Sequence, residues 1–350
     1  MSLPTHPDLA PITRHLRAMY SSRLLIAAVH HLYVFEELAT SPLSIEDLQT
    51  RLGLKERPAM VLFPALCAMG MLAFNRANQL QLTDLGTCLT YRANPNLAAY
   101  VGLEKSDPAV LEMVERLKND GPLKTPTGIA YIKEGEGPSP MDDPETSRSL
   151  TLALAGRAQL LAPIVAHKLP RHNGHLLDIA GGSGFFTYEW LLANPEATAT
   201  VLDRPQVLTV AAECLDTFSR SNRSGADTVP GRVTLLPGDM LTDELPEANL
   251  ILAASLFHDW PTETCRLLAQ RFANTLKPGG ELWVHDAFLN DALDGPQAVT
   301  DYSAQLFWVT KGRAYSRREY RQWFTEAGLV ATTENISTQL DYGLIRALKP

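Results

Sequence analysis

The sequence has little of what marks several classes of protein. Its four cysteines lie far apart and never form a CxxC pair, which argues against a disulfide framework and a zinc knuckle. No apolar run approaches the ~20 residues that a membrane-spanning helix needs. The first residues lack the basic-then-apolar layout of a secretory signal. We therefore expect a soluble, cytoplasmic protein.

Basic residues are in the minority. The 350 residues include 31 lysines and arginines against 39 aspartates and glutamates, a formal net charge of −8. Proteins whose main partner is nucleic acid or an anionic membrane usually present a basic face, so the composition disfavours both partners. Hydrophobic residues make up 45% of the chain, which is enough to bury a large core, and the length suits two domains.

Three regions differ in pattern. Residues 1–100 read as helices followed by a two-stranded ribbon, and residues 101–170 as a helical connector that covers a site. Residues 171–350 alternate short apolar runs with helical stretches, which predicts a parallel sheet and an α/β fold.

The first region has the order of a winged helix. Ser44 begins a short helix and Gly53 ends it, a second helix covers about 57–71, and a ribbon lies around 74–82. Such motifs often bind DNA through a helix that carries Arg, Lys, Asn or Gln to base edges. The helix over 57–71 is instead apolar nearly all round. We expect it to seek a protein partner, which favours a dimerisation module over a DNA-binding one.

A glycine-rich turn follows the first strand of the third region. The segment Leu177–Gly184 reads LDIAGGSG, and glycines at a strand-to-helix turn let the backbone approach a ligand closely. The spacing differs from the GxGxxG of dinucleotide-binding proteins. Asp178, just before the glycines, would repel a phosphate and suits a ligand that bears an ammonium and a sulfonium.

Two more acids follow the next two strands. Asp203 ends the second strand, where an acid can bind both hydroxyls of a ribose. Asp239 follows the third strand, where it and the backbone of Met240 suit an adenine edge. Because ligands bind outside the carboxyl ends of parallel strands, Asp178, Asp203 and Asp239 together predict one ligand crevice.

These motifs resemble those of the class I S-adenosylmethionine-dependent methyltransferases, in particular the dimeric small-molecule O-methyltransferases of plants and of bacterial polyketide synthesis. The resemblance covers nearly the whole chain and is most specific in Leu256–Trp260. It implies a Rossmann-like sheet of seven strands, the last one antiparallel, and an N-terminal winged-helix dimerisation domain. Its other motifs read VLDRPQVL, PGDM, LFHDWPTETCRLLAQ, LKPGGELWVHDAF and YSRREYRQWFTEAGL.

The resemblance also implies the cofactor and the roles of single residues. His258 is the expected general base and Asp286 its orienting carboxylate; a histidine, with a pKa near ~6.5, suits the removal of a phenolic proton. We expect the acceptor pocket to include Met113, Tyr302, Phe307 and Trp308, and no metal. The residues predicted to bind S-adenosylmethionine are Asp178, Gly181, Gly182, Gly184, Asp203, Arg204, Gly238, Asp239, Met240, Ser255, Asp259 and Trp260.

One departure bears on the reaction. Many relatives carry a second acidic orienting residue in a segment like KGxERT, and here Ala314 stands at that position. His258 is therefore expected to have one carboxylate partner. The departure keeps open C- or N-methylation or a repurposed cofactor-binding fold. A regulator that binds the cofactor and uses the winged helix on DNA is the alternative from another class.

The sequence thus predicts an S-adenosylmethionine-dependent O-methyltransferase of secondary metabolism. It is expected to act on a hydroxyl of a small, aromatic metabolite and to form a homodimer through its N-terminal domain.

Overall fold

The chain divides into two compact units. The computed structural model describes residues 7–121 and 139–350. The sheet unit holds the described residues within Tyr131–Asp286 and Arg318–Pro350, and the helical unit holds those within Leu9–Ala130 and Ala287–Arg317. Residues 287–317 thus pack with the helical unit, although their sequence pattern continues that of the region 171–350.

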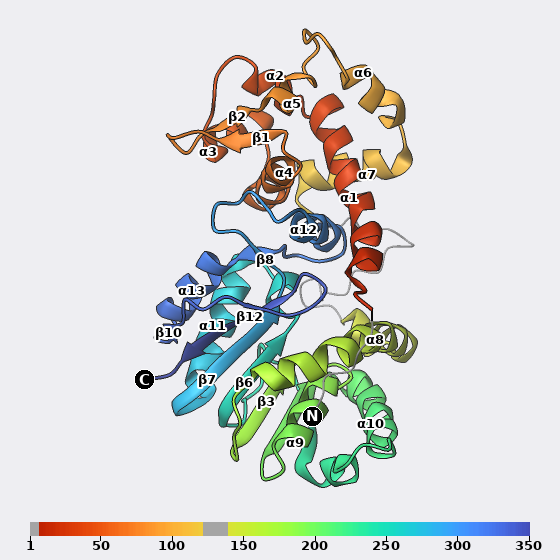
Figure 1. Cartoon of the computed structure of the whole chain (residues 1–350), viewed down its shortest axis with the longest axis vertical. Helices are drawn as coiled ribbons and strands as arrows, with labels where there is room; N and C mark the ends of the chain where they lie inside the picture. Colours follow the sequence, from red (N-terminus) through yellow and green to blue (C-terminus); the bar gives the residue numbers. More distant parts are fainter. Residues whose placement is uncertain (1–6, 122–138) are drawn as a thin grey trace. The chain divides into compact units, whose positions relative to one another are not determined.

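One mixed sheet forms the centre of the sheet unit (Figure 1). Within the described residues it has eight strands in the order β10-β12-β7-β6-β3-β4-β5, with β11 beside β12. Strands β3 to β7 are parallel, and β12 is antiparallel to β7. The predicted Rossmann-like sheet with an antiparallel last strand is confirmed, and the short β11 adds one strand to it. The strands are β3 (His175–Ile179), β4 (Thr198–Asp203), β5 (Val233–Pro237), β6 (Ala248–Ala254), β7 (Leu276–Asp286), β10 (Val330–Ala331), β11 (Ile336–Ser337) and β12 (Gly343–Leu348).

Helices complete the sheet unit. The central strands are almost wholly apolar because parallel strands are covered on both faces. Leu176, Leu250 and Leu252 share one core with α8 and α9, and α11 packs on β7. The helical segments are η2 (Pro140–Asp142), α8 (Pro144–Lys168), α9 (Phe185–Ala193), α10 (Pro205–Ser219), η3 (Ala226–Arg232), η4 (Phe257–Asp259), α11 (Thr262–Thr275) and α13 (Arg317–Glu326).

Helix α8 contains a long, predominantly apolar stretch. By length and composition it could cross a membrane, a test that the core helix of a soluble domain also passes. In the structure α8 packs on α9 and α10, and Ala162, Val165 and Ala166 on it are buried in the core of the sheet unit. Other elements of the sheet unit therefore cover part of its apolar surface.

The helical unit contains the expected winged-helix order. Ser44 accepts a hydrogen bond from the backbone N–H of Asp47 at the start of α3, and Gly53 ends that helix with a φ of 65°. Strands β1 and β2 pair antiparallel. The elements are α1 (Ala10–His30), α2 (Val34–Leu38), α3 (Ile45–Leu52), α4 (Glu56–Ala68), β1 (Leu72–Phe74), β2 (Leu80–Leu82), α5 (Asp84–Thr87), α6 (Ala98–Val101), η1 (Gly102–Glu104), α7 (Pro108–Asn119), β8 (Phe288–Leu289), α12 (Gln297–Val309) and β9 (Tyr315–Ser316).

Helix α4, expected over 57–71, does not need another protein to cover it. Leu62, Phe63 and Leu66 lie fully buried in the core of the helical unit, where α4 packs on α1 and α12. The expectation that this helix seeks a partner was wrong, because α12 joins the unit from a distant part of the sequence. A helix that is buried on its own unit cannot enter a DNA groove, which also disfavours the DNA-binding alternative.

Candidate cofactor and catalytic site

A cavity of about 280 Å³ lies within the sheet unit, at the carboxyl ends of β3, β4, β5 and β6. Its floor follows these strands, and η2 and α8 contribute a further wall that includes Met141, Leu154 and Arg157. Most of the residues predicted to bind the cofactor line it: Gly181, Gly182, Asp203, Arg204, Gly238, Asp239, Met240, Ser255, Asp259 and Trp260. Of that predicted set, Asp178 and Gly184 are not among the described lining residues.

The glycine loop needs its glycines for two different reasons. A Cβ atom on Gly181 would lie 2.8 Å from Val201 and 2.9 Å from the carboxyl carbon of Asp178, so the loop backbone rests directly on these side chains. Gly182 has a φ of 58°, which glycine adopts without strain, and open space where a side chain would be. The loop thus presents bare backbone to the cavity.

Asp178 lies beneath this loop. Its side chain is fully buried, and one carboxyl oxygen accepts a 2.7 Å hydrogen bond from the hydroxyl of Thr187. The other oxygen, Oδ1, is buried and has no hydrogen-bond partner among the described residues. Burial raises the pKa of Asp178 to about 7. Asp178 therefore supports the loop from below.

Asp203 is placed to receive donors from two elements. Its Oδ2 accepts the backbone N–H of Gly182 at 2.8 Å, and its Oδ1 accepts the backbone N–H of Arg204 at 2.7 Å. Burial raises the pKa of Asp203 to about 6, although both hydrogen bonds favour the ionised form. Each carboxylate oxygen can accept a second donor, so the pair remains suited to a vicinal diol.

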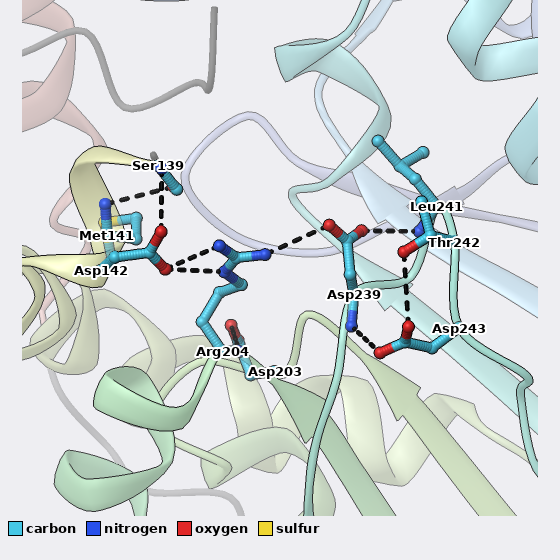
Figure 2. Close-up of polar contacts among 9 residues, drawn as sticks. All are labelled: Ser139, Met141, Asp142, Asp203, Arg204, Asp239, Leu241, Thr242 and Asp243. Carbon is cyan, nitrogen blue, oxygen red and sulfur yellow. Dashed lines mark hydrogen bonds and ion pairs between the residues drawn. The ribbon is translucent and has the colours of Figure 1, made fainter. Parts of the chain in front are cut away.

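Arg204 joins two acids across the cavity rim (Figure 2). Its guanidinium contacts Asp142 of η2 at 2.6 Å and Asp239, after β5, at 3.1 Å. Figure 2 also shows the other carboxylate oxygen of Asp239 accepting the N–H of Leu241, at 2.9 Å. The charges of Arg204 and Asp239 thus partly neutralise each other, and the bridge ties η2 to the ends of β4 and β5.

His258 lies in the single turn η4 and is only 3% exposed. Its Nδ1 is 2.5 Å from Oδ1 of Asp286, at the end of β7. An ionised carboxylate can only accept, so Nδ1 carries a proton, and in the neutral ring Nε2 keeps its lone pair. A second acid was not expected beside the ring, yet Asp259 lies 3.7 Å from Nε2.

The two acids determine the protonation of this histidine. Burial alone would lower the pKa of His258, but the carboxylates of Asp286 and Asp259 together raise it above its ordinary value. Burial raises the pKa of Asp259 to about 6. His258 does not itself line the described part of the cavity, whereas its neighbours Asp259 and Trp260 do.

Tyr320 was not singled out by the sequence pattern. Its hydroxyl donates a 2.8 Å hydrogen bond to Oδ2 of Asp286, so the carboxylate receives one donor on each oxygen. Tyr320 lies within the YSRREYRQWF segment, but no spacing rule connects an aromatic there with an acid that ends β7. The α8 residues of the cavity wall were missed for the same reason, since only the packing of α8 brings them to the sheet edge.

The predicted acceptor residues lie in the helical unit. Met113 and Phe307 are fully buried in its core. Trp308 packs against that core, and the guanidinium of Arg116 lies 4.3 Å from its ring. The guanidinium of Arg17 lies 4.0 Å from the ring of Tyr302. Their role in an acceptor pocket stays a prediction. Among the residues that the structure describes, no cluster of His, Cys, Asp and Glu could hold a metal ion.

Comparison with known proteins identifies the family. The model of the O-methyltransferase domain matches residues 139–330. A crystal structure of an O-methyltransferase family 2 protein from Planctomyces limnophilus, in complex with apigenin, is 36% identical in sequence. It superposes with a TM-score of 0.86 over 100% of this chain and 98% of that one.

Two curated relatives match over most of their length. The 3-hydroxy-5-methyl-1-naphthoate 3-O-methyltransferase of Streptomyces sahachiroi is 26% identical over 89% of this chain and 86% of its own. The N,N-dimethyltransferase OxyT of Streptomyces rimosus is 25% identical over 99% of this chain and 100% of its own.

The cavity fits the cofactor of this family. S-adenosylmethionine carries a ribose diol, which suits the doubly anchored carboxylate of Asp203, and a flat adenine ring, which suits a cavity with apolar lining residues such as Leu150 and Leu202. The bare backbone of the glycine loop is a polar feature that a ligand can meet. On its sequence, its fold and this cavity, the chain belongs to the S-adenosylmethionine-dependent O-methyltransferase family.

Proposed function

We propose that the acceptor is a small aromatic hydroxyl compound and that His258 is the general base, oriented by Asp286. The single observation that carries the proposal is the buried His258–Asp286 pair, at 2.5 Å, directly before two residues of the cavity wall. Two relatives point to the acceptor class: the one solved with apigenin and the one that methylates a hydroxynaphthoate.

Each side chain would have a distinct task. When bound, S-adenosylmethionine supplies a methyl group on a positively charged sulfur. Asp286 holds Nδ1–H of His258, so that Nε2 can take the proton of the acceptor hydroxyl. Because the pKa of His258 is raised, the ring is a stronger base than free histidine but is neutral only at a higher pH. We therefore expect kcat/KM to rise with pH through that raised pKa.

The cofactor residues would divide into ligands and supports. Asp203 would accept the ribose hydroxyls, and the backbone of the glycine loop and of Met240 would contact the rest of the cofactor. Asp178 would hold the loop in shape, and Arg204 would hold η2 in place through Asp142. With these assignments, the predicted cofactor residues all belong to one site, but Asp178 and Arg204 have indirect roles in it.

A test separates the base from the cofactor site. His258→Ala should lower methyl transfer to a phenolic acceptor by roughly 100-fold or more, while calorimetric affinity for S-adenosylhomocysteine stays within about two-fold. Flavones and hydroxynaphthoates, followed by product mass, provide the acceptor panel. Full activity in the His258→Ala protein would remove the base from the proposal.

N-methylation is the second candidate, because the relative OxyT is an N,N-dimethyltransferase that aligns with nearly the whole chain. A neutral amine attacks without first losing a proton, so it needs no base. Matched phenol and aniline acceptors decide between the two. Transfer to the aniline that is insensitive to His258→Ala would favour the amine.

The helical unit would form the dimer interface. Ile12, Leu16 and Met19 repeat at helical spacing along α1 and are 67%, 56% and 44% exposed. They form an apolar stripe that faces water in the single chain. Tyr100 and Leu103 are more than 70% exposed on α6 and η1, which pack on the same helix. A second copy of the chain is the proposed occupant. The four cysteines, all among the described residues, form no disulfide, which suits the proposed cytoplasmic location.

A further inference from the structure

Asp286 is held from both sides. Its Oδ1 is 2.5 Å from Nδ1 of His258, and its Oδ2 is 2.8 Å from the hydroxyl of Tyr320. The three side chains come from η4, β7 and α13, and Asp286 and Tyr320 are both 0% exposed. A carboxylate that accepts a donor on each oxygen has its plane fixed, because rotation about its Cβ–Cγ bond would break both hydrogen bonds.

Tyr320 is itself held rigidly. Its ring lies 5.4 Å from Phe257, 5.2 Å from Trp323 and 6.1 Å from Phe324. Phe257 directly precedes His258, so the same aromatic cluster sets the position of the turn that carries the imidazole. A buried tyrosine needs a polar partner for its hydroxyl, and Asp286 is that partner.

We propose that Tyr320 is a positioning residue of the methyl-transfer reaction, which acts by fixing the carboxylate of Asp286 and, through it, the ring of His258. The inference rests on the proposed role of His258 as base. Tyr320 acts through Asp286 and is not a group that reacts with the substrate.

The direction of its effect follows from charge. The hydroxyl of Tyr320 withdraws negative charge from Asp286, so its removal leaves a more basic carboxylate that holds a protonated imidazole more tightly. Tyr320→Phe should therefore raise the pKa of His258. Among the described residues, the charged or titratable groups that act on His258 include Asp259 on its own turn, Asp286 and His285 on β7, and Arg157 on α8.

The experiment measures the titration of His258 directly. The histidines are labelled with ¹⁵N, the signal of His258 is assigned by its loss in His258→Gln, and the pH titration is recorded on the full chain without cofactor or acceptor. In Tyr320→Phe the midpoint should move up by about half a pH unit, and the acidic limb of kcat/KM should move with it. S-adenosylhomocysteine affinity should be unchanged, and kcat should fall roughly ten-fold.

Tyr188→Phe is the matched control. Its hydroxyl is also buried and donates to the carbonyl of Ala211, at 3.0 Å. It should lower stability by about as much as Tyr320→Phe, ~1 kcal/mol, without moving the His258 midpoint. A 3-fluorotyrosine at position 320 covers the case in which Tyr320→Phe does not fold. This hydroxyl is a stronger donor in the same volume, so the midpoint should move down.

Two results have separate meanings. A His258 midpoint that stays at its wild-type value in both position-320 variants overturns the inference about Tyr320. Full activity in His258→Ala overturns the proposed role of His258 as the base. The titration of His258 can still be measured in that case, so the two failures are distinguishable.

Discussion

Gly182 donates its backbone N–H to Oδ2 of Asp203 across 2.8 Å, which ties the glycine loop after β3 to the end of β4. The carboxylate of Asp203 therefore holds the glycine loop in place in the ligand-free protein. Any ligand that uses Asp203 meets an acceptor whose position the loop has already fixed, and fewer degrees of freedom are lost on binding.

Asp203→Asn tests this acceptor. Asparagine has one carbonyl oxygen in place of two carboxylate oxygens, so it cannot accept from Gly182, Arg204 and a ribose diol together. We expect calorimetric affinity for S-adenosylhomocysteine to fall by roughly 10-fold or more. Asp216→Asn, on the solvent-exposed face of α10, is the control and should bind normally. Unchanged affinity in Asp203→Asn would exclude the ribose role.

The Arg204 bridge should affect how fast the ligand leaves. Its ion pairs are partly exposed, with side-chain exposures of 27% for Arg204 and 39% for Asp142, so each is worth at most ~1 kcal/mol and is screened by salt. Arg204→Gln should speed S-adenosylhomocysteine release up to about five-fold in stopped-flow measurements. Added salt should speed release from the wild type towards that value.

A double variant separates the bridge from a direct contact with the ligand. If Arg204 acts through Asp142, then Asp142→Asn with Arg204→Gln should release the ligand no faster than Arg204→Gln alone. Additive effects would instead indicate that Arg204 contacts the ligand itself.

Asp178 predicts a pH-dependent stability. Burial raises its pKa from 3.8 to about 7. Between these two pH values, the folded chain therefore holds a proton on Asp178 that the unfolded chain has released. The stabilisation that protonated Asp178 allows is complete below pH 3.8 and is lost as the pH rises through about 7.

Asp178→Asn keeps an oxygen for Thr187 and removes the ionisation. Relative to wild type, the free energy of unfolding of this variant should increase between pH 4 and pH 8, by up to ~4 kcal/mol. Denaturant melts of the ligand-free protein at several pH values measure the difference. A difference that does not change with pH would show that Asp178 titrates normally. Thr187→Val, which removes the donor that lowers this pKa, should extend the pH-dependent loss of stability to higher pH.

The α1 stripe predicts the state of assembly. Leu16→Glu with Met19→Glu places two charges on the proposed interface, and we expect sedimentation equilibrium to give the mass of one chain instead of two. Leu267→Glu is the matched control, since Leu267 is 48% exposed on α11 of the sheet unit. An unchanged mass for the α1 variant would reject this face as the interface.

Local chemistry explains what the sequence could predict. Ser44 and Gly53 are the residue types that helix ends require, and α9 covers Phe185–Ala193 as the apolar pattern after the glycine loop indicates. The strands follow from short apolar runs, and the strand order places Asp203 and Asp239 at one edge. These signals lie within a few residues of each other in the chain.

Long-range packing explains what it could not. The burial of α4 depends on α12, more than two hundred residues later, and the second donor to Asp286 comes from Tyr320 on α13. Asp178 has the residue type of a ligand, but its place below the loop depends on the close approach of Gly181. No periodicity in a single sequence reports such neighbours.

The apolar character of α8 has a practical consequence for anyone who annotates chains of this kind by hydropathy. By length and composition alone, this segment would be predicted as a membrane-spanning helix, with Leu150 and Leu154 facing lipid. In the structure both leucines line the cavity, and Leu154 is 44% exposed there. The hydropathy of α8 thus comes both from residues buried in the core and from leucines that line the cavity. A hydrophobic helix beside a glycine loop can therefore mark a small-molecule site, and its hydropathy alone does not make it a membrane span.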